Sequence, residues 1–281
     1  MGRHRSANGA ARKLGSRLAP AVARTGANFL AADIAKCVRR EAAYREIGAL
    51  IEEDRLWGNL LSSQALTFNL FARAKLDRDF AARLCRELVP NLIERVAWVA
   101  FEHSPGRGDP QMLSDYTAFD LFIMGAGAAG EPTFLAIEVK YSESLRQQPR
   151  RQASRYRELT RAYALHANPE SDVLFAEPLA QLTAEHLLSA IIKEKLGPEA
   201  RGTFLTIAPA DNRDAWHGIE RYRQTLTAEP PGVPFISLTL ETAIEAVRDA
   251  GDADLADRLR ERYTDFAPVH AVIEDWEPFV T

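Results

Sequence analysis

Hydrophobic and polar positions follow two different periods along this chain, and the change of period predicts its elements. Residues 28–51 and 60–88 have the apolar spacing of amphipathic helices, and Pro90 ends that helical run. Residues 1–28 are rich in Gly, Ala, Arg and Ser and lack hydrophobic periodicity. We therefore expect a basic tail without regular structure before the first helix.

Strand-like patterns occupy the middle of the chain. Residues 95–103 (RVAWVAFEH), 115–124 (DYTAFDLFIM) and 133–142 (TFLAIEVKYS) are typical of three consecutive strands, separated by Gly- and Pro-rich turns. Helical sequence at about 149–166 and 184–196 is followed by a buried strand at 203–208. Short turns give antiparallel pairs and a helical crossover permits a parallel pair. The pattern therefore predicts an α/β fold with a mixed sheet.

The end of the chain returns to helical sequence. We expect a helix at 212–226, a short edge strand at 234–240 and helical structure at 241–263. The chain is then divided into a basic tail (1–28), an N-terminal helical region that packs on the core (29–92), an α/β core (93–240) and a C-terminal helical region (241–281).

The composition is ordinary for a soluble globular protein, with 46% hydrophobic and 26% charged residues. No apolar run approaches the ~18–20 residues that span a bilayer, and the N-terminus lacks a good signal-peptide core. We therefore expect a cytoplasmic protein without a membrane partner. Two cysteines, Cys37 and Cys85, are too few for a four-cysteine metal site and are expected to be buried thiols.

Two acids and a lysine interrupt strands that should otherwise be buried: Asp120, Glu138 and Lys140. Glu138 and Lys140 share one face of their strand, because residues i and i+2 point to the same side. If the two strands form a hairpin, Asp120 can meet them. Two carboxylates at ~4 Å repel by about 4 kcal/mol at an effective dielectric of ~20, so a proton or a cation is needed between them. Mg²⁺ suits such ligands, with Mn²⁺ as a substitute. A structural Glu–Lys pair is the alternative.

This pattern resembles the PD-(D/E)XK, or restriction-endonuclease-like, nuclease superfamily. The resemblance rests on Asp120, on Glu138-Val139-Lys140 as the (D/E)-x-K element, and on the 17 residues between them. The order of elements over residues 76–208 is similar to the α-β-β-β-α-β core of the superfamily. The resemblance implies that Asp120 and Glu138 bind metal and that Lys140 is catalytic. Asp120 follows Phe119, where the superfamily motif has a proline.

Gln152 and Tyr156, four residues apart after the Lys140 strand, resemble the Q-x-x-x-Y element of the RecB-like and Cas4-like branches. On a helix these side chains lie on one side, and we expect both to reach the catalytic site. A fortuitous pair is the alternative. With two cysteines in the chain, we expect no iron–sulfur cluster.

Further candidates lie near this site. Glu102 lies in the first strand, just before the turn, and could be an extra metal ligand, as in some members of the superfamily, or a surface carboxylate. Residues 144–163 contain six arginines and one acid. Arg150, Arg157 and Arg161 form one stripe that suits a phosphate backbone. A solvated arginine-rich face is the alternative.

The net charge of −4 slightly opposes nucleic-acid binding, but its distribution is uneven. We expect a Mg²⁺-dependent nuclease that hydrolyses phosphodiester bonds, with DNA rather than RNA as its substrate. The alternative is a catalytically inactive nuclease fold that binds DNA or a protein partner. Both hypotheses allow a homo-oligomer.

Overall fold

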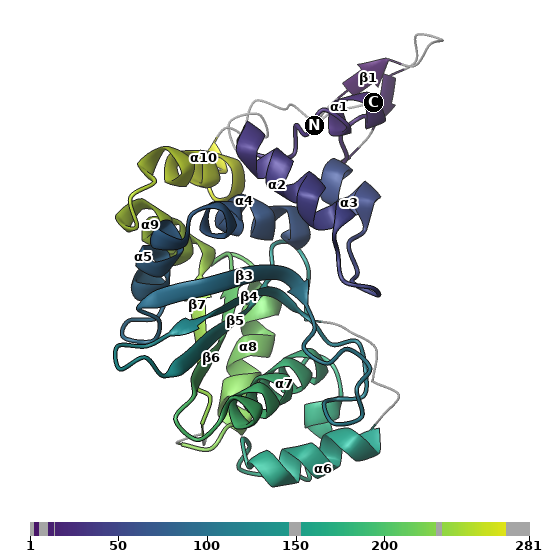
Figure 1. Ribbon diagram of the computed structural model, residues 1–281. Helices are drawn as coiled ribbons and strands as arrows, with labels where there is room; N and C mark the ends of the chain where they lie inside the picture. The colour runs from purple at the N-terminus through teal and green to yellow at the C-terminus, as the bar shows by residue number, and fades with distance from the viewer. Residues whose placement is uncertain (1–2, 6–10, 14, 146–152, 229–231, 268–281) are drawn as a thin grey trace, which may run out of the picture.

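The computed structural model of the protein describes residues 3–5, 11–13, 15–145, 153–228 and 232–267. A five-stranded sheet of order β3-β4-β5-β6-β7 lies at its centre (Figure 1). The strands are β3 (Arg95–His103), β4 (Phe119–Ala126), β5 (Pro132–Val139), β6 (Arg201–Ala208) and β7 (Phe235–Thr239).

The sheet is mixed, as predicted. β3 pairs with β4 and β4 with β5 in antiparallel fashion, whereas β5–β6 and β6–β7 are parallel. β3 spans the predicted residues 95–103, because its alternating pattern is bounded by clear turn signals. β4 begins four residues later than predicted, since the polar segment 115–118 approaches the sheet as a loop.

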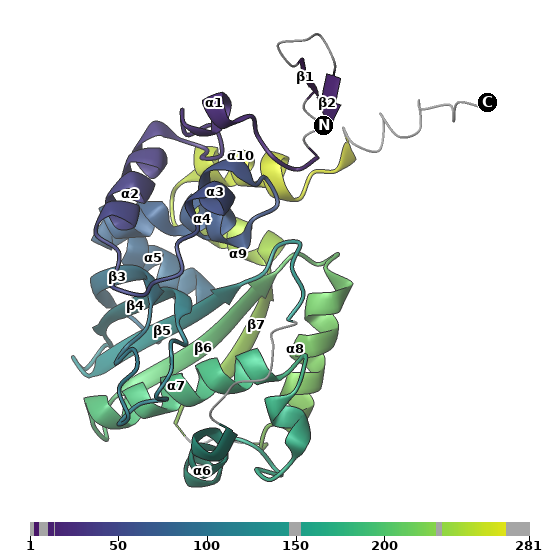
Figure 2. The ribbon, with the colours of Figure 1, turned by 90° about the vertical axis from the view of Figure 1, so that its right-hand side faces the viewer.

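Helices cover both faces of the sheet (Figures 1 and 2). The first face is covered by α2 (Ala32–Ala43), α4 (Ser63–Leu76), α5 (Arg78–Leu88), α9 (Leu240–Asp249) and α10 (Ala253–Tyr263). The opposite face is covered by α6 (Ala153–Tyr163), α7 (Ala180–Leu196) and α8 (Arg213–Thr225). Each layer buries its own hydrophobic core, and the apolar residues of the central strands contribute alternately to the two cores.

The remaining elements are short: β1 (Arg3–Arg5), β2 (Ala11–Lys13), α1 (Pro20–Ala23), α3 (Glu53–Gly58) and a 3₁₀ helix, η1 (Asp172–Phe175). Regular structure thus reaches into residues 1–28, which we expected to lack it. Hydrogen bonds rather than periodic apolar contacts hold the end of this segment. Buried Asn28 donates from Nδ2 to the carbonyl oxygens of Leu56 and Asn59, at 2.8 and 3.1 Å.

The first long helix is shorter than its apolar pattern predicts. α2 ends at Ala43, and residues 44–52 form a loop in which Gly48 has a φ of 84°. A left-handed glycine favours a turn over a continuous helix. Both cysteines are buried free thiols, as predicted. Of the helices in the described part of the chain, none has the length and apolar character needed to cross a bilayer.

Candidate active site

Three predicted site residues occupy one row across three adjacent strands. Leu121 of β4 pairs with Ile137 of β5 and with Phe101 of β3. The next opposed positions in this register are Asp120, Glu138 and Glu102. Opposed residues of neighbouring strands point to the same face of a sheet, so the register brings the three carboxylates together.

Glu102 stands at an unusual point of the backbone. Its φ of 49° lies in the left-handed region, which is costly for a residue other than glycine. Such strain persists where the surrounding structure fixes it, and it is concentrated at functional sites. Gln64 of α4 helps to fix Glu102, because its Nε2 donates to Glu102 Oε1 at 2.6 Å.

Lys140 joins the row from the residues directly after β5. Its ammonium lies 2.7 Å from Glu138 Oε1, and both side chains are largely buried. Asp120 Oδ2 accepts a hydrogen bond of 2.8 Å from the backbone N–H of Val139, which ties β4 to β5 where their ladder ends. The predicted trio of Asp120, Glu138 and Lys140 is therefore one cluster.

The cluster opens into a polar cavity of about 340 Å³. Asp120, Glu138, Lys140 and Glu102 line this cavity. The neighbouring helices and loops add further polar side chains to its wall, among them Arg55, Gln64, Arg107, Gln181 and Glu185.

Gln181 and Glu185, one turn apart on α7, were not predicted as site residues. Gln181 Nε2 donates to Glu138 Oε1 at 2.5 Å and to Glu185 Oε1 at 2.9 Å. Both side chains are buried. One signal for them was available in the sequence. An i, i+4 pair of polar residues in a helix of otherwise apolar character is costly to bury unless each polar group finds a partner.

Gln64 was also missed, although it joins the site to the helical layer. Besides Glu102, its Nε2 donates to the carbonyl oxygen of Leu50 at 2.9 Å. The same layer is fixed to the loop after β5 by Glu143. This carboxylate accepts from Arg55 and from Ser63, whose backbone N–H lies 3.0 Å away.

Burial and mutual repulsion perturb the acids of the cavity. Burial, followed by the charges of Glu138 and Glu102, raises the pKa of Asp120 well above its ordinary value. Burial and the charge of Glu138 raise the pKa of Glu102 to about 7. Burial alone would lower the pKa of Lys140, but the carboxylates of Glu138, Asp120 and Glu185 raise it. The cavity thus concentrates negative charge around a single ammonium group.

The Q-x-x-x-Y residues are only partly described. Gln152 lies outside the described residues, whereas Tyr156 is buried on α6. The Tyr156 hydroxyl donates to Asp115 Oδ2 and lies 3.3 Å from Thr117 Oγ1. Tyr156 is not among the residues that line the cavity. The Tyr156 hydroxyl thus contacts the segment that leads into β4.

The predicted arginine stripe is partly neutralised by acids. Arg150 lies outside the described residues. Arg157 pairs with Asp172, and Arg161 pairs through two nitrogens with Glu170, one of these contacts being 2.7 Å. A phosphate backbone would have to compete with these exposed carboxylates.

Comparison with known proteins adds a decisive observation. The family model of the PD-(D/E)XK nuclease superfamily matches residues 1–265. The chain belongs to the PD-(D/E)XK nuclease superfamily. No curated protein and no solved structure matches it significantly. The five-stranded mixed sheet with helices on both faces agrees with the restriction-endonuclease-like fold of this superfamily.

PD-(D/E)XK nucleases typically use divalent metals. Burial, followed by the charges of Glu138 and Glu102, raises the pKa of Asp120, and a cation between Asp120 and Glu138 would offset the repulsion between these two carboxylates. Within the described ranges, no three His, Cys, Asp or Glu side chains are gathered closely enough to enclose a metal. Mg²⁺ does not require such a cage, since one or two carboxylates, water and substrate phosphate complete its shell. Asp120 and Glu138 are the two carboxylates that fit this requirement best.

Proposed function

We propose that this protein is a metal-dependent nuclease that hydrolyses the phosphodiester bonds of DNA. The observation that supports the proposal is the meeting of Asp120, Glu138 and Lys140 in one polar cavity. A structural ion pair does not require the second carboxylate, which is destabilised by burial and by its neighbours.

Each side chain of the cavity has a proposed role. Asp120 and Glu138 hold Mg²⁺ or Mn²⁺, with Glu102 as a further ligand. The bound metal would supply positive charge to the phosphate oxygens. The ammonium of Lys140 orients water and donates hydrogen bonds to the phosphate as negative charge builds on it.

Other residues act indirectly, by holding residues of the site in place. Gln181 holds Glu138 and Glu185 in place through its two donated hydrogen bonds. We assign Tyr156 a positioning role, because its hydroxyl fixes Asp115 five residues before Asp120. Gln152, its partner in the Q-x-x-x-Y element, is retained as a proposed site residue on the superfamily resemblance.

We also propose that Arg150, Arg157 and Arg161 bind the phosphate backbone. Removal of one arginine that binds a phosphate should reduce the slope of log K against log salt by about 0.9 for duplex DNA. Arg157→Ala combined with Arg161→Ala should therefore reduce this slope by nearly two. An unchanged slope would mean that both arginines remain with Asp172 and Glu170.

The central test is cleavage of DNA by the purified protein with Mg²⁺. Asp120→Ala and Lys140→Ala should each reduce the rate by at least ~100-fold, as expected for loss of an electrostatic group at the reacting phosphate. Lys36→Ala is the matched control, because Lys36 is exposed on α2. Cleavage that persists in both site variants would contradict the proposed site. DNA binding without cleavage in Mg²⁺, Mn²⁺ or Ca²⁺ would favour the inactive binding module.

A further inference from the structure

Four large hydrophobic side chains are exposed in two segments that contribute to the wall of the active-site cavity. Tyr44, Ile47 and Leu50 lie in the loop of residues 44–52, and Tyr116 lies just before β4. Ile47 is 98% exposed, Leu50 70% and Tyr116 64%. We call these four residues the apolar rim. Leu50 and Tyr116 line the same cavity as Asp120 and Glu138.

The loop that carries the rim is anchored by polar contacts. Arg107 Nη1 donates to the carbonyl oxygen of Gly48 at 2.9 Å, and Gln64 Nε2 donates to that of Leu50 at 2.9 Å. Glu46 accepts from the backbone N–H of Ser104 at 3.3 Å and from Arg107 at 3.3 Å. The polar groups of the loop thus face the protein, while its large apolar side chains face solvent.

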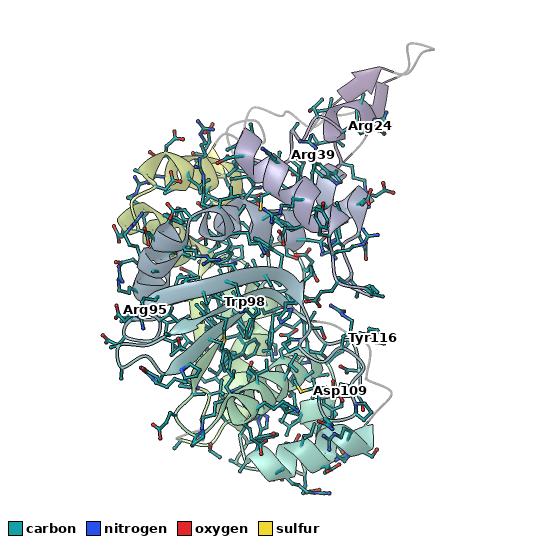
Figure 3. All side chains as sticks on the ribbon, viewed as in Figure 1. Arg24, Arg39, Arg95, Trp98, Asp109 and Tyr116 are labelled. Atoms are coloured by element: carbon teal, nitrogen blue, oxygen red, sulfur yellow. The ribbon has the colours of Figure 1, made fainter. Side chains whose placement is uncertain are left out.

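The two parts of the rim adjoin each other. A Cβ on Gly48 would lie 3.3 Å from the Tyr116 ring and 3.2 Å from Arg107. Glycine at this position therefore allows the loop to approach Tyr116 closely. Figure 3 labels Tyr116 on the side of the molecule to which this loop descends. Leu50 and Tyr116 thus lie at the cavity itself, and the loop that carries the other two rim residues adjoins Tyr116.

Acids outnumber cations among the described residues that line this cavity. The cations among them are Arg55, Arg107 and Lys140, and each is paired with a carboxylate. The acids that line the same cavity are Glu52, Glu102, Asp120, Glu138 and Glu185. Exposed apolar side chains at this cavity therefore offer the neighbouring nucleotides an attraction that does not depend on charge.

We infer that the apolar rim binds unpaired bases on either side of the phosphate in the cavity, so that the preferred substrate is single-stranded. The inference rests on the proposed nuclease function. In a duplex the base faces are covered by stacking and pairing, whereas unpaired bases offer their faces to aromatic and aliphatic side chains. Stacking of bases on aromatic side chains does not depend on sequence.

The test is fluorescence anisotropy with a labelled single-stranded oligonucleotide and with the duplex of the same sequence. All proteins carry Lys140→Ala so that the DNA remains intact. The rim variant combines Ile47→Ser, Leu50→Ser and Tyr116→Ala. The control combines Leu76→Ser and Val173→Ser, two exposed apolar positions that do not line the cavity. The rim variant should bind the single strand at least about tenfold more weakly and the duplex unchanged, while the control binds both as before.

Three results would overturn the inference: unchanged single-strand binding in the rim variant, an equal loss for single strand and duplex, or an equal loss in the control. A fourth is the dissociation of a dimer to monomers in the rim variant, measured by sedimentation, because the rim would then be a contact between copies of the chain. Melting temperatures check that the variants fold. If the wild type cuts no DNA but the rim variant alone loses single-strand binding, the nuclease proposal fails and the rim inference stands.

Discussion

Gln181 donates a 2.5 Å hydrogen bond from its side-chain amide to Glu138 Oε1. The same amide nitrogen donates to Glu185 Oε1, so one buried group orients two carboxylates. Groups that orient metal ligands in this way usually change metal affinity 10–100-fold when they are removed. The contact therefore connects α7 to the carboxylates that lie on the central sheet.

We expect Gln181→Ala to weaken Mn²⁺ binding about tenfold and to slow cleavage at limiting metal, because Glu138 loses its fixed orientation. Isothermal titration calorimetry with Mn²⁺ measures the affinity, and a metal titration of cleavage measures the activity. Gln224→Ala, at an exposed position on α8, is the control. An Mn²⁺ affinity equal to that of the wild type would show that Gln181 is only a packing residue.

Glu102→Gln should stabilise the metal-free protein at high pH. Burial and Glu138 raise the folded-state pKa of Glu102 from 4.5 to about 7. The unfolded state therefore loses this proton first, and ionisation of Glu102 destabilises the fold as pH rises from 4.5 to 7. The variant lacks this cost, which amounts to ~3 kcal/mol.

Urea denaturation of wild type and Glu102→Gln at pH 5 and pH 8 checks this prediction. The stability of the variant relative to the wild type should be greater at pH 8 than at pH 5. A difference that does not change with pH would contradict the raised pKa. In the presence of Mn²⁺, a weaker affinity of the variant would support Glu102 as a further ligand.

The trio was predictable because it depends on contacts that are local in the sheet. Strand alternation placed Glu138 and Lys140 on one face, and a hairpin brings Asp120 opposite Glu138. Gln181 and Gln64 come from helices distant in sequence, so no local pattern connects them to the row. The spacing of apolar residues along α7 also does not indicate which of its side chains reach the site, because residues 180–192 are all buried. A helix buried on every side has no polar face to mark which residues reach the site.

His186 should make stability fall as the pH is lowered. Its Nε2 lies 2.8 Å from the carbonyl oxygen of Val233, to which it donates, and its Nδ1 lies 2.9 Å from the Tyr222 hydroxyl. Burial lowers the pKa of His186 to about 4. The unfolded state takes up this proton near pH 6.5, so the contribution of His186 is complete above 6.5 and decreases down to pH 4.

The loss amounts to ~3 kcal/mol for this residue. Denaturation at several pH values between 7 and 4.5 should give a shallower dependence for His186→Gln than for the wild type. His217→Gln, on the exposed side of α8, is the control. Equal slopes for wild type and His186→Gln would show that the histidine takes up its proton at the same pH in the folded and unfolded states.

Tyr156→Phe separates a positioning role from a catalytic one. The variant loses a hydrogen bond to the carboxylate of Asp115, which should cost ~1.5–3 kcal/mol of stability. Because Tyr156 does not line the cavity, Mn²⁺ affinity should stay unchanged and cleavage should slow only modestly. Tyr163→Phe is a matched control. The Tyr163 hydroxyl also donates to a carboxylate, that of Glu194 on α7, and neither residue lines the cavity. A large loss of cleavage at unchanged stability would mean that Tyr156 reaches the substrate.

The row of carboxylates has a consequence for the order of folding. Glu102, Asp120 and Glu138 belong to strands that follow one another in the chain, whereas Gln181 belongs to the crossover between the parallel strands β5 and β6. Contacts between neighbouring segments close shorter loops and form sooner than parallel pairing. We therefore expect the carboxylates to gather while they are still hydrated. We expect the docking of α7, whose Gln181 contacts Glu138, to remove water from them late in folding.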